Sequence, residues 1–162
     1  MIPPDGMDPL GGGAVWMLDD TRARTLRAVE GTEPELIDAL ALGGGNSIGA
    51  LLYHVAAVEL DWLYQDMLAQ PFPDWSNALF PYEVRERGGR LTPVRGILLG
   101  DHLERLASVR EHLHEELAAM TGDELRGVPD GSPSGATREW VLHHLREHEA
   151  EHRGQIQELA RC

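Results

Sequence analysis

Apolar residues recur at steps of three and four along most of the chain, a spacing that places them on one face of an α-helix. The first such run ends before Gly31, a residue suited to ending a helix, and consists of Val15, Leu18, Leu26 and Val29. Residues 1–13 before it are rich in Pro, Gly and Asp. We therefore expect a flexible N-terminus over residues 1–13 and one folded domain over residues 14–162.

A short second helix is predicted directly after the first. Thr32 and Glu35 have the spacing of a capping box, in which each side chain accepts a hydrogen bond from the other residue's backbone N–H. The helix is expected to run over residues 34–42 and to stop at the three glycines of residues 43–45.

The next predicted helix is long and apolar on nearly every side. Asn46 or Ser47 can cap its start, and the helical pattern continues to about Leu68. Its apolar residues are Leu51, Leu52, Val55, Val58, Leu60, Trp62 and Leu63. A helix of this kind lies either in the centre of a domain or at a buried interface between subunits.

Residues 70–91 form the longest irregular stretch, with several prolines, glycines and aromatic residues. A connection of that length usually crosses the body of a domain or covers a site, and a crossover leaves the flanking helices parallel. Thr92 and Pro93 are predicted to start the next helix, which Gly122 ends, and Thr137 caps the last helix. The sequence thus predicts an all-α fold, a four-helix bundle with a long crossover between the second and third long helices.

The charge of the chain narrows the range of partners. There are 27 acidic residues against 14 basic ones, which gives a formal net charge of −13. Such a chain repels phosphate backbones and anionic membranes, so we expect it to bind neither nucleic acid nor a membrane. We expect a cytoplasmic protein, because there is no recognisable secretory signal or membrane-spanning run and the single cysteine, Cys162, forms no intrachain disulfide.

His148 and His152 are four residues apart in the last predicted helix. Residues at this spacing are neighbours on one face, with Cβ atoms about 5–6 Å apart, so both imidazoles can reach one metal ion. Both fall in an apolar stripe formed by Val141, Leu145, Ile156 and Leu159. Because buried imidazoles need a polar partner, the pair predicts a metal site.

His54 is the natural third ligand, because it lies in the middle of the long apolar helix. His144 lies one turn before His148 and is either an alternative ligand or part of the pocket mouth. Asp61 shares the face of His54 but lies about 10 Å along the axis, too far to be a ligand. The remaining histidines have charged neighbours and are expected at the surface: His102, His112, His114 and His143.

The same residues also match a peptidase motif. His148, Glu149 and His152 have the spacing of a zinc peptidase, in which the glutamate is the general base. Those enzymes take a third ligand from further along the chain. Here the downstream carboxylate, Glu158, points about 120° away from His152 on the helix, which argues against this site.

A carboxylate-bridged di-iron bundle is a further alternative. It needs a glutamate with a histidine three residues later on two helices, and Glu111 and Glu149 both meet that requirement. It also needs a core glutamate from each remaining helix. His54 occupies the place of one such glutamate, and Glu59 is predicted to point away from it.

Two segments resemble the DinB/YfiT-like family of metalloenzymes, namely residues 46–59 (NSIGALLYHVAAVE) and residues 148–156 (HEAEHRGQI). The resemblance covers nearly the whole chain. It implies an up-down-down-up four-helix bundle with one divalent metal ion held by His54, His148 and His152. Dimers are common among such proteins, so a homodimer is expected.

Better-understood members of that family are thiol-dependent enzymes, including bacillithiol S-transferases and mycothiol-dependent isomerases. The resemblance therefore implies a metal-dependent transferase that acts on a small molecule with a low-molecular-weight thiol cosubstrate. Three imidazoles suit zinc, nickel or iron, and such an ion can lower the pKa of a thiol. A metal-dependent hydrolase and a metal-binding bundle without catalysis are the alternatives. Gln155 is expected to support the site, and no catalytic residue is assigned.

Overall fold

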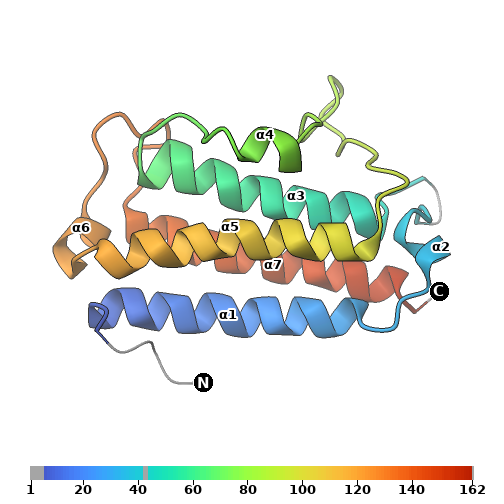
Figure 1. Ribbon diagram of the computed structural model, residues 1–162, viewed down its shortest axis with the longest axis horizontal. Helices are drawn as coiled ribbons and strands as arrows, with labels where there is room; N and C mark the ends of the chain where they lie inside the picture. Colours follow the sequence, from blue (N-terminus) through green and yellow to red (C-terminus); the bar gives the residue numbers. More distant parts are fainter. Residues whose placement is uncertain (1–5, 42–43, 162) are drawn as a thin grey trace.

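The computed structural model describes residues 6–41 and 44–161. The helices in this part of the chain are α1 (Pro9–Val29), α2 (Pro34–Ile37), α3 (Ile48–Asp61), α4 (Ser76–Leu79), α5 (Leu99–Ala119), α6 (Gly122–Arg126) and α7 (Arg138–Leu159). A π-helical segment, η1 (Trp62–Met67), continues α3 without a break. The long helices α1, α3, α5 and α7 form a bundle, and the short helices lie in the connections (Figure 1).

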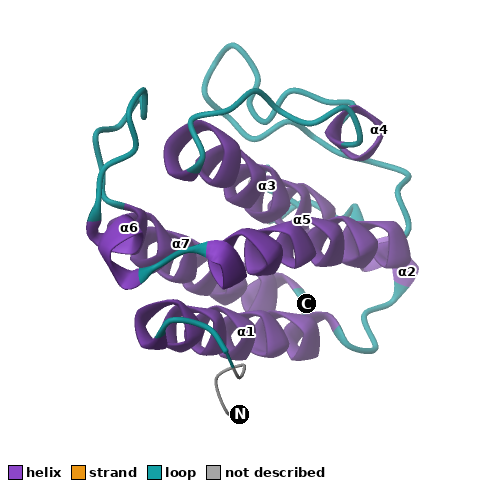
Figure 2. Ribbon diagram, turned by 60° about the vertical axis from the view of Figure 1, so that its left-hand side comes forward, coloured by secondary structure: helices purple, strands orange, loops and turns teal. Residues whose placement is uncertain are grey.

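The direction of the long helices confirms the predicted topology. α1 and α7 run one way and α3 and α5 run the other, as the colour gradient in Figure 1 shows. α1 packs against α5 and α7, and α3 packs against the same two helices. The bundle is therefore up-down-down-up, and the parallel pair α3 and α5 requires the long connection that passes over α3 (Figure 2).

This crossover is tied to two helices of the bundle. The Tyr53 hydroxyl on α3 donates to the carbonyl oxygen of Tyr82 at 2.7 Å and accepts from the N–H of the same residue at 3.0 Å. Arg105 on α5 donates to the carbonyl oxygen of Leu79 at 2.6 Å, and its guanidinium lies over the Tyr53 ring. These contacts fix the crossover against α3 and α5, and with it the side chains that the crossover carries.

Two helices begin at the predicted capping residues, and a third ends next to the predicted glycine. Ser47 accepts a hydrogen bond from the Ala50 N–H at the start of α3, and Thr137 accepts one from the Trp140 N–H at the start of α7. The C-cap of α1 is Glu30, and the predicted Gly31 follows it with a φ of +72°, a left-handed conformation that glycine adopts without strain. Local chemistry of this kind is readable from sequence, because the interacting groups lie within a few residues of each other.

α1 begins earlier than the predicted Val15. The Asp8 side chain accepts a hydrogen bond from a backbone N–H at 2.9 Å, and Pro9 is favourable in the first turn of a helix. Residues 9–13 are therefore helical, so α1 includes part of the segment before Val15. Gly11 is buried, and a Cβ there would meet atoms near the end of α5 and in α6 at 3.5 Å, so its small size allows close packing.

The second predicted helix is shorter than expected. α2 has four residues, its N-cap is Glu33, and no side chain caps its N-terminus. The predicted capping box of Thr32 and Glu35 is therefore wrong. The predicted end of this helix at Leu42, the first glycine of the following run and Cys162 lie outside the described residues.

Both ends of the third long helix also differ from the prediction. α5 begins at Leu99 rather than after Thr92, because Gly96 has a φ of +71° and its N–H donates to the Asp38 carboxylate at 2.7 Å. A left-handed residue cannot belong to a right-handed helix. Gly122 is the first residue of α6 and does not end α5. The short helix α6 starts there because Thr121, its N-cap, forms a capping box with Glu124.

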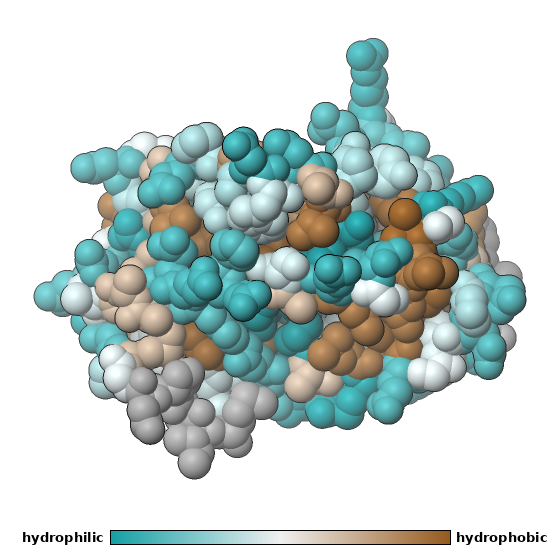
Figure 3. Space-filling view, viewed as in Figure 1, coloured by the Kyte–Doolittle hydropathy of each residue, from teal (hydrophilic) through white to brown (hydrophobic). Residues whose placement is uncertain are grey.

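α3 is apolar on nearly every side because other segments of the same chain pack around it. Leu51, Leu52 and Val55 have at most 2% of their surface exposed. The composition of this helix therefore does not require a second subunit, and the homodimer stays a prediction. On the outer surface, apolar side chains gather in patches (Figure 3). Leu26 and Leu103 lie in a groove between α1 and α5. None of the described helices combines the length and the apolar character needed to cross a membrane.

Candidate metal centre

Three histidines from two helices meet inside the bundle. His54 lies in the middle of α3, and His148 and His152 lie one turn apart on α7. The Nε2 atom of His148 is 3.1 Å from Nε2 of His54 and 3.1 Å from Nε2 of His152. The three histidines singled out in the sequence thus form one group that could hold a metal ion.

The spacing of these nitrogens fits a single ion. Imidazole nitrogens bind zinc at about 2.0–2.1 Å, so two of them at tetrahedral or octahedral angles lie roughly 2.9–3.4 Å apart. Both 3.1 Å separations fall in that range. His54 is only 3% exposed, and its Nδ1 has no hydrogen-bond partner among the described residues. Its polar contacts are therefore on the side of the other two histidines.

Gln155 holds the outer nitrogen of His152. Its Oε1 atom lies 3.2 Å from His152 Nδ1, one turn further along α7. Because an amide oxygen only accepts hydrogen bonds, Nδ1 carries the proton and Nε2 presents its lone pair to the centre. This contact is of the supporting kind expected for Gln155.

Burial keeps the three imidazoles neutral. It lowers the pKa of His54 to about 4, and repulsion from His152 and Arg85 adds to the effect. Burial likewise lowers the pKa of His148 to about 3, with repulsion from the neighbouring histidines as the next cause. The pKa of His152 is also lowered, again mainly by burial. Neutral imidazole is the form that binds a metal, so at pH 7 protons do not compete for these nitrogens.

A pocket of about 590 Å³ opens beside His54 and His148, and we call it the metal pocket. Its walls come from α3, η1, α7 and the crossover. Charged groups of both signs line it, because Asp61 and Glu83 contribute carboxylates and Arg85 contributes a guanidinium. A cavity of this size suits a small molecule rather than a polymer chain.

An aromatic cluster lies along one side of the metal pocket. The His144 ring is stacked on Trp140, with 4° between the ring planes and 5.2 Å between the centroids, and it lies 4.7 Å from the ring of Trp62. The centroid of His144 is 6.0 Å from that of His148, and His144 does not belong to the three-histidine group. Of the two roles considered for His144, a place at the pocket wall fits the structure.

One histidine predicted at the surface is buried. His102 on α5 is fully enclosed, with its Nδ1 3.2 Å from Arg105 and its Nε2 against Gly49. The prediction rested on charged neighbours in the sequence, and of these Asp101 and Glu104 are exposed whereas Arg105 is buried beside His102. The other three are half-buried or exposed: His112, His114 and His143.

A buried ion-pair network occupies the bundle next to the metal centre. Glu59 accepts hydrogen bonds from Arg22 and Arg110, both at 2.6 Å, and Glu149 accepts from the same arginines at 2.8 and 3.2 Å. Each long helix contributes one residue, and the four charges cancel. The apolar periodicity did not predict this network. The available signal was that both arginines interrupt the apolar stripes of their helices.

The network argues against the two alternative metal sites. Glu149 is the glutamate of the peptidase motif, but it is 2% exposed and paired with two arginines, so it cannot serve as a base at the histidines. A di-iron site would need Glu59 and Glu149 as ligands, and the arginines occupy both carboxylates. The histidine that follows Glu111, His114, lies 2.9 Å from Asp19 instead.

Comparison with known proteins places most of the chain in one family. The model of the DinB superfamily matches residues 17–156, a region that includes all three histidines and most of the bundle. No curated protein matches the chain. Because the family match extends over most of the sequence, the chain belongs to the DinB superfamily.

Proposed function

We propose that the protein is a metal-dependent thiol S-transferase, in which His54, His148 and His152 hold one divalent ion and a low-molecular-weight thiol is joined to a small electrophile. The observation that carries the proposal is the meeting of three imidazole nitrogens, two pairs of them 3.1 Å apart, beside a pocket. When bound, a zinc, nickel or iron ion supplies a Lewis acid that lowers the pKa of a thiol.

The protein's own side chains would orient the thiol. Arg85 and Glu83 on the crossover and Asp61 on α3 offer partners of both charges in the metal pocket. A small thiol with ionised groups can pair with them, whereas an uncharged one cannot. Trp62 and His144 add aromatic rings to the lining of the same pocket.

A metal-dependent hydrolase is the second candidate, and Asp61 favours it. This carboxylate lines the metal pocket, and burial, with repulsion from Asp66, raises its pKa. A carboxylate with a raised pKa takes up a proton more readily, so it could remove one from an attacking water molecule.

The decisive experiment measures both reactions with the same preparations. Protein loaded with zinc, nickel or iron is assayed for S-conjugation of an alkyl vinyl ketone with several thiols, including cysteine and glutathione, and for hydrolysis of activated esters. Conjugation that stops on chelation and in His148→Ala, but continues in the matched control His143→Ala, supports the transferase.

Each of the other three outcomes leads to a different conclusion about the function. Absence of metal-dependent conjugation with every thiol refutes the transferase. Ester hydrolysis that disappears in Asp61→Asn supports the hydrolase instead. Tight metal binding without either reaction identifies a bundle whose metal has no catalytic role.

A further inference from the structure

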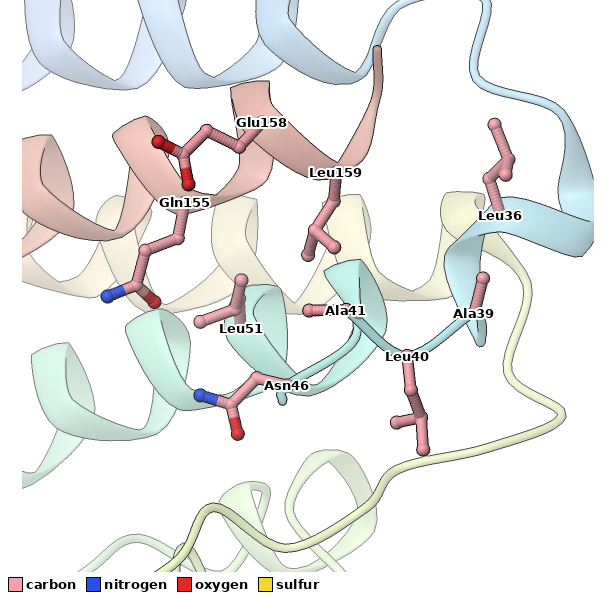
Figure 4. A pocket seen from close by; sticks show the side chains of 9 residues that line it. All are labelled: Leu36, Ala39, Leu40, Ala41, Asn46, Leu51, Gln155, Glu158 and Leu159. Carbon is pink, nitrogen blue, oxygen red and sulfur yellow. The ribbon is translucent and has the colours of Figure 1, made fainter. Parts of the chain in front are cut away.

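A second pocket lies on the other side of the metal centre, along the same two helices. It has a volume of about 520 Å³ and lies between α3, α7 and the segment around α2 (Figure 4). Leu51 comes three residues before His54 on α3, and Gln155 comes three residues after His152 on α7. Because α3 and α7 are antiparallel, both steps lead in the same direction along the bundle. We call this cavity the Gln155 pocket.

The two pockets therefore flank the three histidines. The metal pocket includes Trp62 and His144, which lie on the opposite side of the centre along α3, η1 and α7. Its wall carries ionised groups, whereas the Gln155 pocket is mainly lined by aliphatic side chains. A reaction that joins a polar molecule to an apolar one needs two sites of this kind.

The lining of the Gln155 pocket is polar at one end only. The amides of Asn46 and Gln155 lie at the end nearer to the metal centre, and the apolar end towards α2 is formed by Leu36, Leu40 and Leu159 (Figure 4). A ligand that fits this lining has one polar group and an apolar tail.

Gln155 determines what the polar group should be. Its Oε1 accepts the hydrogen bond from His152 Nδ1, so the NH₂ is the part of this amide that remains to donate to a ligand. A carbonyl oxygen is the simplest matching acceptor. The net charge of −13 favours a neutral carbonyl compound over an anionic acid.

We propose that the Gln155 pocket binds the electrophile of the transferase as a neutral α,β-unsaturated carbonyl compound with an apolar tail, an assignment that rests on the proposed function. The Gln155 amide donates to the carbonyl oxygen, and the tail lies against the leucines of the pocket. In the reaction, sulfur bonds to the β-carbon, the carbon–carbon π bond breaks, and the thiol proton ends on the α-carbon. The addition is complete without an oxidant or a leaving group.

Binding can be tested without the reaction. Methyl hexyl ketone has the carbonyl group and the tail but no reactive double bond. It is titrated into zinc-loaded protein while the side-chain NH₂ signal of Gln155 is followed by NMR. We expect a saturable shift of this signal. Ala39→Phe fills the pocket and should weaken binding by about tenfold or more, whereas the same replacement at Ala118, exposed on α5, should leave it unchanged.

A second variant that fills the Gln155 pocket controls for a folding defect in Ala39→Phe. Leu40 is 48% exposed, so Leu40→Trp can enter the pocket without disturbing the core, and circular dichroism checks its helix content. If both filling variants bind the ketone as the wild type does, or if the Gln155 signal does not move, the assignment of the pocket is overturned.

Failure of the pocket and failure of the proposed function give different results. Conjugation of pentyl vinyl ketone is measured separately with the active thiol. If methyl hexyl ketone binds but no thiol adds to the vinyl ketone, the transferase is refuted and the carbonyl-binding pocket stands. If conjugation proceeds with the same KM in Ala39→Phe as in the wild type, the pocket assignment is refuted and the transferase stands.

Discussion

Glu59 and Glu149 share their partners, because both carboxylates accept hydrogen bonds from Arg22 and from Arg110 in the interior of the bundle. The four residues come from four different helices and are at most 7% exposed. Removal of one member would leave a buried charge without its counterpart, which is far more costly than loss of a surface ion pair.

The stability of the fold should depend on the ionisation of Glu59. Burial alone would raise its pKa, but attraction by Arg110 and Arg22 outweighs burial and lowers the pKa from 4.5 to about 2. Ionised Glu59 therefore contributes fully above about pH 4.5, and its contribution decreases as the pH falls towards 2. A shift of this size corresponds to a contribution on the order of 3 kcal/mol.

Chemical denaturation of the wild type and Glu59→Gln between pH 7 and pH 3 measures this contribution. The variant should be less stable at pH 7 by about 3–5 kcal/mol, and the difference should narrow below pH 4.5. Asp20→Asn is the control, since the Asp20–Arg24 pair is exposed, and its effect should stay below about 1 kcal/mol. A difference between wild type and Glu59→Gln that does not change with pH would contradict this account.

Replacement of His148 should remove the metal site and leave the bundle folded. Its Nε2 is the atom that both other imidazoles approach, so His148→Ala leaves two nitrogens for an ion that needs at least three protein ligands. Elemental analysis of purified protein should show close to one equivalent of metal in the wild type and little in the variant. His143→Ala, on the exposed side of the same helix, should keep its metal.

The thermal midpoint of metal-free His148→Ala then separates two roles of the metal. A midpoint close to that of metal-free wild type is expected, because the core and the ion-pair network are untouched. A collapse of the fold when the metal is removed from the wild type would identify a structural metal instead.

Gln155 should control the affinity for metal without being a ligand. Its Oε1 fixes the proton of His152 on Nδ1, so Gln155→Leu allows the ring to rotate and to adopt the other tautomer. A loss of about 10–100-fold in zinc affinity is expected in a competition titration with a chelator. Gln157→Leu, exposed on another face of α7, is the control. Equal affinities in both variants would show that the hydrogen bond has no influence on the centre.

Gly49 should resist replacement because α3 meets α5 there. A Cβ at this position would lie 3.1 Å from Nε2 of His102 and 3.3 Å from the carbonyl oxygen of Ile37. Gly49→Ala is expected to destabilise the fold by about 1–3 kcal/mol, more than the roughly 1 kcal/mol that alanine gains in helix propensity. Gly13→Ala on α1 meets no atom within 4 Å and should stabilise instead. Urea denaturation at constant pH distinguishes the two, and a more stable Gly49→Ala would contradict the packing argument.

The histidine centre could be predicted because its pattern is local or conspicuous. His148 and His152 are one turn apart, and His54 is the one histidine in a long apolar helix. The resemblance of the two surrounding segments to a known family then joined positions that periodicity alone cannot relate. Topology was predictable for a similar reason, since a long connection between the second and third long helices allows them to run parallel.

The missed features depend on contacts between distant parts of the chain. Arg22 and Arg110 look like interruptions of an apolar stripe until the opposite helices supply Glu59 and Glu149. The start of α5 was missed because Gly96 adopts a left-handed conformation and bonds to Asp38, which lies far away in sequence. The Gln155 pocket needs three segments side by side, and no single segment indicates it.

The crossover is attached to the bundle separately from the three histidines. The Tyr53 hydroxyl forms its hydrogen bonds with backbone atoms of Tyr82, so these two bonds do not depend on which side chain the crossover carries there. The imidazoles belong to α3 and α7, while Glu83 and Arg85 are carried by the crossover. Under the proposed function, substitutions in that loop would change which molecule binds beside the histidines while the three imidazoles keep their positions, so the substrate range of this scaffold could be altered through one wall of the metal pocket.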